Sequence, residues 1–475
     1  MQNKQTPFWL FTLALLFALT LPVLVQDGMF KDGMLYAGIA KNLAEDRGSF
    51  WALHFSPSLF NIFNGHPPLA FGIQALFFKI LGNSIYTERV YSFFTFCITL
   101  VLISFLWKRL FAGNKVIQCI SWLPCLLWGS TPLVFWSYSN NMLENTMGVF
   151  TLLACLFILE SRNKKRSLFL IIAAGGFIFL GTLCKGLPAL FPIAMPVLIG
   201  IANRNPSVLK NIFHSILLLA TVVVLYALIF TYEPARISMV SYVNNQILPS
   251  INDGNATVDS RLFILLRLIA ELAVPLTILL LVWFYSKQKK SILYFDKEIL
   301  KSALLFFLTG LSASLPIMIT LKQSGYYLVP SFPYFAIAFA CLLSPLAIQA
   351  MKNISVSYST YRIATFITVF LLLAVLLFSA LQIGKTVRDK DMLHDVHLIG
   401  EKVPPYTIVS TTYRIATDWS FHEYLTRNFD ICLADKIRPE YEFFIEENAD
   451  SIPNLIKTER VNIPTKKYNL YKIIK

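Results

Sequence analysis

The hydrophobic residues of this chain fall in long runs that shorter polar or charged segments separate. About eleven runs have roughly the twenty residues that a helix needs to cross a bilayer. We therefore expect an all-α polytopic membrane protein with spans at residues 8–26, 89–107, 116–136, 142–160, 167–183, 187–202, 212–231, 264–285, 301–320, 327–348 and 363–383. The first run ends in Val-Leu-Val-Gln rather than in the small residues of a cleavage site, which favours a retained anchor over a signal peptide.

The loops between these runs differ in charge. Clusters of Lys and Arg occupy alternate loops, at residues 108–115, 162–166, 204–210, 287–297 and 352–362. Because basic loops stay on the cytoplasmic side, we expect an integral protein of the cytoplasmic (inner) membrane with its N-terminus inside. The loops at 27–88, 137–141 and 232–263 and the C-terminal tail then lie outside.

Composition narrows the class of protein. The chain is 56% hydrophobic and only 14% charged, with a mean hydropathy of +0.60, and a soluble domain this apolar would expose large hydrophobic patches. The formal net charge of +14 does not indicate nucleic-acid binding, because the excess Lys and Arg lies in the short loops. The 7 cysteines show no Cys-x-x-Cys or Cys/His spacing, so neither a disulfide framework nor a zinc site is expected.

The acidic residues indicate where a functional site lies. Asp27, Asp32, Glu45 and Asp46 follow the first apolar run and Glu144 follows the third, so the expected topology places all of them outside. A carboxylate beside a bilayer is costly unless it is used. We interpret the acidic first outer loop, residues 27–88, as part of an enzyme's active site.

This loop predicts helices of its own. Apolar residues recur every four positions within 32–47, at Leu35, Ile39 and Leu43, which indicates an amphipathic helix lying at the membrane surface. Asp32 begins this helix, so it could serve only as a cap for free backbone N–H groups. A second amphipathic segment at 68–81 is too short to span comfortably, and we place it on the outer surface as well.

The tail differs from the rest of the chain, which suggests a membrane domain at 1–384 and an extracytoplasmic domain at 385–475. Within the tail Lys and Arg balance Asp and Glu, and short β-prone segments alternate with helical ones. We expect strands at 406–410, 430–433, 441–445 and 468–474, and helices near 392–402 and 419–426. A small α/β domain follows, whose charged residues are interpreted as a solvated face.

Several short motifs follow one another along the segments expected to be outside. They are Asp32-x-x-x-Tyr36-Ala37, Gly65-His66-Pro67-Pro68-Leu69, Gln74-Ala75-Leu76-Phe77-Phe78-Lys79, Glu88-Arg89, Met142-Leu143-Glu144-Asn145, Cys184-Lys185-Gly186, and Lys322 with Tyr326-Tyr327-Leu328-Val329-Pro330. Each motif is weak alone. Their order over most of residues 8–345 resembles the GT-C glycosyltransferases, above all the protein O-mannosyltransferases and the aminoarabinose transferase that modifies lipid A.

The resemblance implies a hexosyl- or pentosyltransferase that moves a sugar from a polyprenyl-phosphate carrier to a lipid or protein acceptor, with inversion. Asp32 stands at the family position of the base that activates the acceptor oxygen. The leaving phosphate needs positive charge and hydrogen-bond donors. The outer-face residues that could supply them are Arg89, Lys185, Lys322, Tyr326 and Tyr327, although these side chains could also be interface anchors.

Two positions depart from the family pattern. Family members often have Asp-Glu where this chain has Asp32-Gly33, so Glu144 or Asp27 might supply the second carboxylate. His66 stands where the aminoarabinose transferase often has lysine. A histidine can contact phosphate, but its charge depends on pH. Tyr36 of the first motif is a further candidate for binding the substrate.

Other classes of function stay open at this point. A transporter or flippase of a lipid-linked substrate should carry ionisable residues in mid-span and paired repeats. Few candidates exist, since His214 and Glu271 lie near span ends and no repeat is evident. A structural scaffold would leave the clustered charges unexplained. Asp32 and Glu144 could hold a divalent metal, yet the resemblance implies no cofactor besides the lipid-linked donor. The donor sugar, the acceptor, the carrier length and the oligomeric state stay open.

The charge pattern makes a topological prediction. Cysteines introduced at Ser49 and Ser451 should react with a membrane-impermeant thiol reagent in intact cells or spheroplasts. Protection of both, with labelling at Ser161, would contradict the expected topology.

Overall fold

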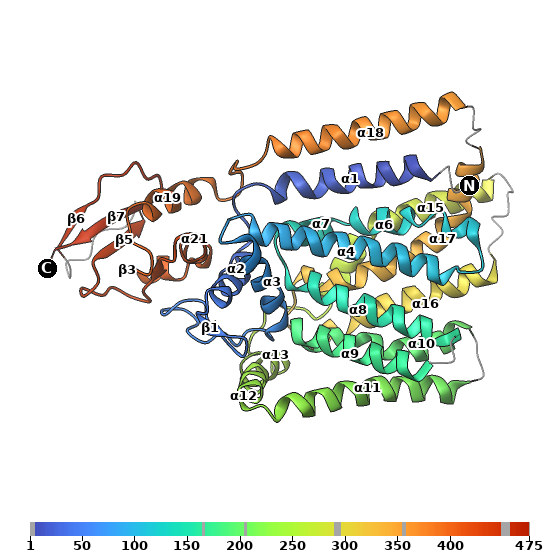
Figure 1. The fold of residues 1–475 in the computed structure, drawn as a ribbon, viewed down its shortest axis with the longest axis horizontal. Helices are drawn as coiled ribbons and strands as arrows, with labels where there is room; N and C mark the ends of the chain where they lie inside the picture. Colours follow the sequence, from blue (N-terminus) through green and yellow to red (C-terminus); the bar gives the residue numbers. More distant parts are fainter. Residues whose placement is uncertain are drawn as a thin grey trace.

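A computed structural model describes residues 5–163, 167–203, 207–288, 296–353, 358–447 and 457–474. Most of the chain forms a bundle of roughly parallel and antiparallel helices, and the C-terminal part forms a separate sheet with helices at one end of the bundle (Figure 1). The first loop lies between the two parts. This arrangement confirms the expected fold class.

Apolar helices make up the bundle. Eight of the described helices, two of them with 3-10 extensions, are long and apolar enough to cross a membrane: α1 (Thr6–Leu24), α4 (Thr87–Leu110), α8 (Leu143–Glu160), α9 (Ser167–Lys185), α11 (Val208–Phe230), α16 (Lys297–Ser314), α17 (Phe332–Asn353) and α18 (Tyr358–Ala380). Two bent pairs also qualify. These are the pair formed by Lys115–Gly129 with Pro132–Ser139, bent by 75°, and the pair formed by Phe263–Glu271 with Ala273–Leu281, bent by 52°.

The elements between these spans are shorter. The bent pairs comprise α5 (Lys115–Gln118), α6 (Trp122–Gly129), α7 (Pro132–Ser139), α14 (Phe263–Glu271) and α15 (Ala273–Gln288). The run expected to span at 187–202 is a 3-10 helix, η3 (Leu187–Ala194), that continues into α10 (Met195–Asn203). Its prolines explain the irregular start, because each removes a backbone N–H donor. The number of spans in a bilayer therefore stays a prediction.

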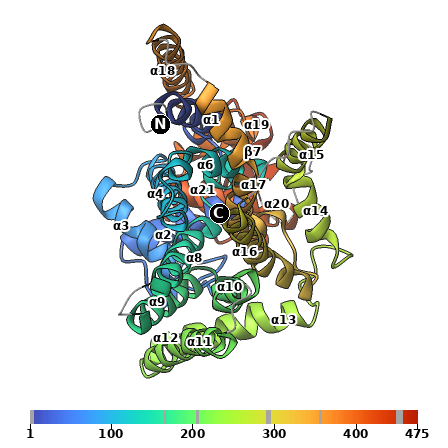
Figure 2. The ribbon, with the colours of Figure 1, turned by 90° about the vertical axis from the view of Figure 1, so that its right-hand side faces the viewer.

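The outer helices have the exposure that lipid contact requires. α11 and α18 stand at the periphery of the bundle in the end-on view (Figure 2), and most of their apolar side chains are exposed. An apolar surface of this extent has to be covered by lipid or by another protein. The aromatic-rich interior, by contrast, is closely packed around residues such as Trp107, Trp128 and Tyr334.

The first loop folds as two helices, as expected, but its first helix does not lie at the membrane surface. α2 (Lys31–Ala44) packs against α3 (Leu69–Leu81) and against α21 (Trp419–Phe429) of the tail, and its residues 33–42 are all buried. The expectation of a surface helix is therefore wrong. The apolar stripe is covered by protein instead of lipid. A short hairpin of β1 (Gly48–Ser49) and β2 (Ala52–Leu53) separates the two helices.

The tail is a small α/β unit, as expected. Its described residues form a five-stranded sheet in the order β4-β3-β5-β7-β6. β3 pairs in parallel with β4 and β5, whereas β7 pairs antiparallel with β5 and β6. The strands are β3 (Ile408–Thr411), β4 (Cys432–Leu433), β5 (Phe443–Glu447), β6 (Thr458–Arg460) and β7 (Tyr468–Ile473), with α19 (Lys390–Gly400), α20 (Tyr413–Ala416) and α21. Sequence patterns missed β6, which has three residues.

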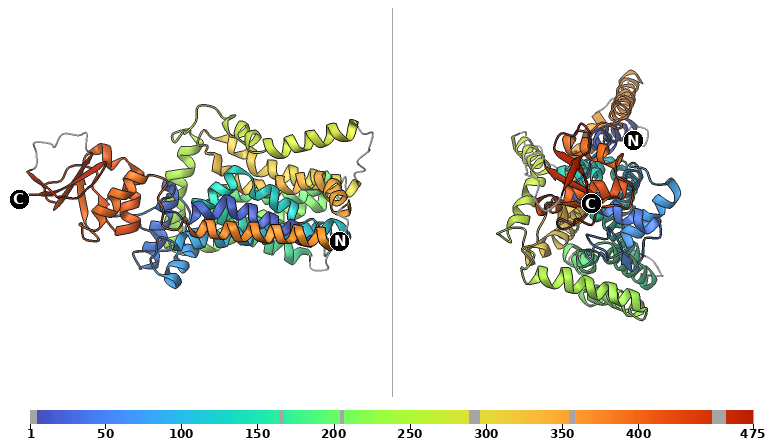
Figure 3. Two further views of the ribbon diagram at one scale, coloured as in Figure 1. Left: turned by 90° about the horizontal axis from the view of Figure 1, so that it is seen from above. Right: turned by 90° about the vertical axis from the view of Figure 1, so that its left-hand side faces the viewer.

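The tail lies against the first loop (Figure 3), and buried polar contacts fasten the two together. The guanidinium of Arg427 in α21 is 2.7 Å from Glu88 at the start of α4, and both side chains are 1% exposed. Arg427 also donates to Asn83 and to the carbonyl of Ser84. Nearby, the Lys41 ammonium is 2.7 Å from Asp430. The position of α2 is thus set by the tail as well as by the bundle.

The structure also refines the topology test. Ser161 is 2% exposed, so a cysteine there would react poorly from either side, and Ser451 lies outside the described residues. Lys115, which is exposed at the basic end, is the better inside reporter.

Arg427→Met should loosen the tail from the bundle. The change removes one of the two cations beside the buried Glu88 carboxylate and leaves only Arg89 at 3.3 Å, so the loss should stay below the about 3–5 kcal/mol of a buried charge left without any partner. Hydrogen exchange should then report faster opening of α21. Lys472→Met is the control, because it breaks the exposed pair with Glu442, worth about 0–1 kcal/mol. Equal protection of α21 in both variants would show that Arg427 does not hold the tail.

Candidate active site

Polar side chains from five separate segments meet at the end of the bundle that carries the tail. They belong to the first two turns of α2, the first turn of α8, the last turn of α9, the Gly65–Pro68 turn, and the segment 322–327, which ends within η6 (Gly325–Ser331). The structure brings together Asp32, Tyr36, His66, Glu144, Lys185, Tyr326 and Tyr327, with Lys322 beside them.

Asp32 is held by a hydrogen bond from another part of the chain. The hydroxyl of Tyr326 donates to Oδ2 of Asp32 at 2.9 Å, and the Tyr326 ring stacks on Trp136 with centroids 5.9 Å apart. The residue that caps α2 is Phe30, and no side chain makes a cap hydrogen bond there. The structure therefore favours a functional carboxylate over the helix-cap alternative.

Lys185 is the central cation of the cluster. Its ammonium is 3.0 Å from Oε1 of Glu144, and the two side chains are 6% and 1% exposed. The same ammonium lies 5.6 Å from the ring centroids of Tyr36 and Tyr327. An ion pair this deeply buried requires each partner, because removing one leaves an uncompensated charge.

His66 is a neutral member of the cluster. Its Nε2 lies 3.4 Å from the Lys185 ammonium and 3.2 Å from the Tyr36 hydroxyl. Since an ammonium can only donate, Nε2 is the acceptor and the proton is assigned to Nδ1. Burial lowers the pKa of His66 well below its usual range, and the charges of Lys185 and Lys322 lower it further. His66 therefore does not supply a positive charge near neutral pH.

Lys322 is a second cation, less deeply buried than Lys185. Its ammonium donates to Oε1 of Gln246 at 2.6 Å, and Gln246 lies in the one-turn π-helix η4 (Val243–Ile247), between α12 (Glu233–Tyr242) and α13 (Leu248–Ile251). Burial lowers the pKa of Lys322, and the nearby Lys185 ammonium also lowers it, while Asp32 opposes the shift. Two ammonium groups thus lie near a carboxylate, in the surroundings that would attract a phosphate.

Two sequence candidates lie apart from the cluster. Arg89 donates to the carbonyl oxygens of Gln26, Gly28 and Ile85, so its guanidinium fastens the segment that leads into α2. Asp27 is 2.7 Å from Nε2 of His397 in the tail. The structure therefore favours Glu144 over Asp27 as the second carboxylate, and it favours a positioning contact for Arg89.

The Asp-Gly sequence at residues 32–33 has a steric reason. A Cβ atom on Gly33 would lie 2.1 Å from the carbonyl oxygen of Asn140. Asn140 also accepts a hydrogen bond from the Phe30 N–H, and Asn141 donates to the Gly33 carbonyl. This chain therefore has no room for a glutamate at position 33.

Sequence patterns missed Glu423 of the tail. Its side chain is 1% exposed and its Oε2 atom has no hydrogen-bond partner. Burial raises the pKa of Glu423 well above its usual range, and the Asp32 charge adds to the shift. No local signal marked this residue, because its burial depends on how α21 packs on α2.

Within the described residues, no three His, Cys, Asp or Glu side chains are grouped to hold a metal ion.

Gly33→Ala should destabilise the protein. The added methyl group would overlap the Asn140 carbonyl, and overpacking of this kind costs about 1–3 kcal/mol. The thermal unfolding midpoint measures the effect. Gly148→Ala in α8 is the matched control, since nothing lies within 4 Å of the added atom and alanine favours a helix by about 1 kcal/mol. A stable Gly33→Ala protein would contradict this packing.

Comparisons with known proteins show which folds this chain resembles. Residues 65–230 match the family model described as dolichyl-phosphate-mannose-protein mannosyltransferase. The chain is similar to ArnT from Cupriavidus metallidurans bound to undecaprenyl phosphate, at 12% identity and a TM-score of 0.63 over 97% of this chain and 96% of that one. The apo state of ArnT gives 13% identity and a TM-score of 0.65, over 98% and 97% of the two chains.

A more distant likeness extends to an archaeal enzyme. The oligosaccharyltransferase AglB from Archaeoglobus fulgidus, in complex with an inhibitory peptide and a dolichol-phosphate, gives 11% identity and a TM-score of 0.51. That match covers 92% of this chain and 69% of AglB. No curated protein matches the chain. The chain thus has the fold of the GT-C glycosyltransferases and resembles their mannosyltransferase and ArnT branches.

Proposed function

We propose that this protein is an inverting glycosyltransferase that moves a sugar from a polyprenyl-phosphate donor to a lipid or protein acceptor at the outer face of the membrane. The observation that carries the proposal is the grouping of one carboxylate, Asp32, with two ammonium groups, Lys185 and Lys322, at one end of an apolar bundle. The family-model match and the ArnT-like fold support this reaction class.

Asp32 is the group suited to act as the base. In an inverting transfer, the acceptor hydroxyl loses its proton to the base while its oxygen attacks the anomeric carbon. The bond from that carbon to the phosphate oxygen breaks on the opposite face, and the carrier leaves as a polyprenyl phosphate. The hydrogen bond from Tyr326 holds the Asp32 carboxylate in one orientation.

Lys185 and Lys322 are the groups suited to receive the leaving phosphate. Negative charge grows on the phosphate oxygen as the bond breaks, so a buried cation stabilises that state more than the ground state. An ammonium has three N–H donors. His66 accepts one of those on Lys185 and Glu144 pairs with the ammonium as an ion pair, so N–H donors stay available for a phosphate.

Glu144, His66 and Tyr36 act through Lys185 in this proposal. Glu144 neutralises the ammonium and fixes its position, and the neutral His66 orients it. Tyr36 contacts His66 and shapes the wall of the site together with Tyr327. The donor and the acceptor are assigned only by class. The structures of ArnT and AglB hold polyprenol-type phosphates, and that of AglB also holds a peptide.

The transporter alternative lacks a supporting contact among the described residues. Glu271 accepts from the Leu133 N–H and pairs with Arg267, so it caps the start of α7 instead of lining a path. His214 lies in a separate hollow at the far end of the bundle.

Asp32→Asn should keep the protein folded and remove most transfer activity. Asparagine retains an acceptor for the Tyr326 hydroxyl but cannot take a proton. General-base catalysis contributes about 10²–10⁴-fold to a rate. Mass spectrometry of glycolipids and glycoproteins from cells carrying each variant measures the transfer. Asp27→Asn is the control and should be milder, because its amide can still contact His397. Near-normal transfer in Asp32→Asn would reassign the base.

The lysines require different variants. Lys322→Ala should leave the fold intact and lower turnover, because it removes about 2–4 kcal/mol of transition-state stabilisation. Lys185→Ala would also leave Glu144 buried without its cation, so a loss of activity in that variant could come from lost stability. Lys185→Met with Glu144→Gln removes both charges together. The double variant should regain the thermal stability that Lys185→Met loses, while transfer stays low. Recovery of transfer in the double variant would show that the Lys185 charge is dispensable.

A further inference from the structure

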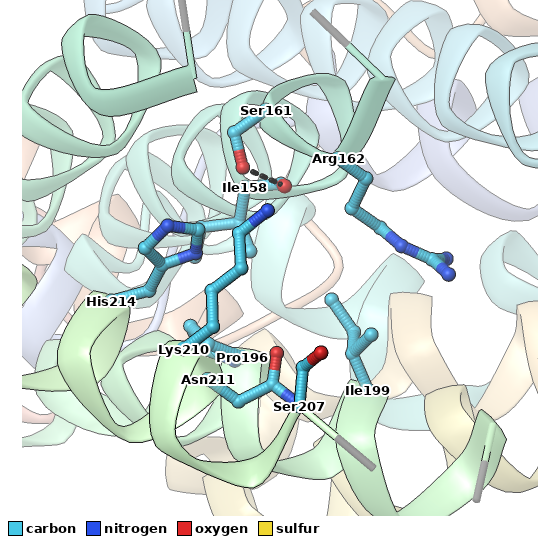
Figure 4. Close-up of a pocket in the computed structure, with 9 residues that line it drawn as sticks. All are labelled: Ile158, Ser161, Arg162, Pro196, Ile199, Ser207, Lys210, Asn211 and His214. Atoms are coloured by element: carbon cyan, nitrogen blue, oxygen red, sulfur yellow. Dashed lines mark hydrogen bonds between the residues drawn. The ribbon is translucent and has the colours of Figure 1, made fainter. Parts of the chain in front are cut away.

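A second polar hollow lies at the end of the bundle opposite the tail. It encloses about 180 Å³ between the end of α8 with η2 (Ser161–Asn163), α10 and the start of α11. That is roughly ten to twenty times the volume that one water needs by the same measure. Its lining residues are Ile158, Ser161, Arg162, Pro196, Ile199, Ser207, Lys210, Asn211 and His214 (Figure 4).

The lining of this hollow favours an anion. Arg162, Lys210 and His214 line it, and no carboxylate does. In the view of Figure 4 the Lys210 side chain extends across the hollow toward Ser161. Glu160, the nearest acidic residue along the chain, is paired with Arg109 on the neighbouring α4. No carboxylate among the lining residues therefore neutralises the positive charge of the hollow.

A further feature supplies hydrogen-bond donors. α11 begins at Val208 beside the hollow, and the first turn of a 23-residue helix presents free N–H groups and the positive end of its dipole. A phosphate is the common anion that accepts from both an ammonium and such N–H groups.

The surroundings point to a lipid as the source of that phosphate. Along α11, Leu209, Phe213 and Ile216 are 81%, 51% and 59% exposed, so the helix next to the hollow presents an apolar face. This face is on the opposite side of α11 from Lys210, Asn211 and His214, and its exposure indicates that lipid surrounds this end of the bundle, so that headgroups meet the hollow. Basic pockets between membrane helices bind anionic headgroups in this manner.

We propose that this hollow binds the phosphate headgroup of an anionic membrane lipid at the end of the bundle opposite the candidate active site. Lys210 and Arg162 supply the charge, and the start of α11 supplies N–H donors. The site is independent of the proposed transfer reaction, since it shares no residue with the cluster around Asp32.

Native mass spectrometry of the purified full-length protein can test the proposal, with phosphatidylglycerol and phosphatidylcholine as probes. The wild type should retain phosphatidylglycerol in preference. Lys210→Gln and Arg162→Gln should each weaken that binding about fivefold, the effect of losing one basic residue near an anionic lipid. Lys115→Gln is the matched control, because it removes an exposed lysine at the same end of the bundle without touching the hollow.

The outcomes separate a built site from general attraction. Loss in the two hollow variants, with near wild-type binding in Lys115→Gln, supports the proposal. Equal losses in all three variants would overturn it, because they would indicate diffuse attraction to the basic end. Displacement of the lipid by millimolar inorganic phosphate in the wild type would also overturn it, since the hollow would then hold a soluble ion.

Discussion

The buried ion pair between Lys185 and Glu144 is the interaction on which the candidate active site depends. A charge buried at the end of an apolar bundle is costly without a partner, because taking it out of water costs several kcal/mol. Glu144 supplies that partner. The Lys185 ammonium also contacts His66 and lies over the rings of Tyr36 and Tyr327. The pair thus holds the Lys185 ammonium at the place where the phosphate binds in the proposed reaction.

The tail contributes to the site indirectly. α2 carries Asp32, and it lies between α3 and α21 with its middle fully buried. On the side of the tail, α2 is held by two ion pairs, Arg427 with Glu88 and Lys41 with Asp430. On the side of the bundle, its first turn is held by hydrogen bonds of Asn140 and Asn141. A carboxylate held from both sides has a defined position, which is what a base needs before the acceptor arrives.

Local patterns predicted much of the fold. The long apolar runs, α2, α3 and four strands of the tail followed from periodicity and length, which are properties of neighbouring residues. Patterns could not show that α2 is covered by α21, because an amphipathic stripe looks the same whether lipid or protein covers it. The same limit explains why Glu423 was missed. It also explains why Gly33 looked like a departure from a family pattern when the cause is the carbonyl of Asn140.

The sequence predicted which residues form the candidate site better than it predicted the contacts between them. Asp32, Lys185 and Lys322 were expected on one side, yet the pairing of Lys185 with Glu144 joins residues far apart in sequence.

A structure of the full-length protein with a polyprenyl phosphate bound tests the account most directly. The account predicts that the phosphate contacts the ammonium groups of both Lys185 and Lys322, with Asp32 facing the adjacent space. A phosphate bound elsewhere, with Lys185 still paired only to Glu144, would contradict it.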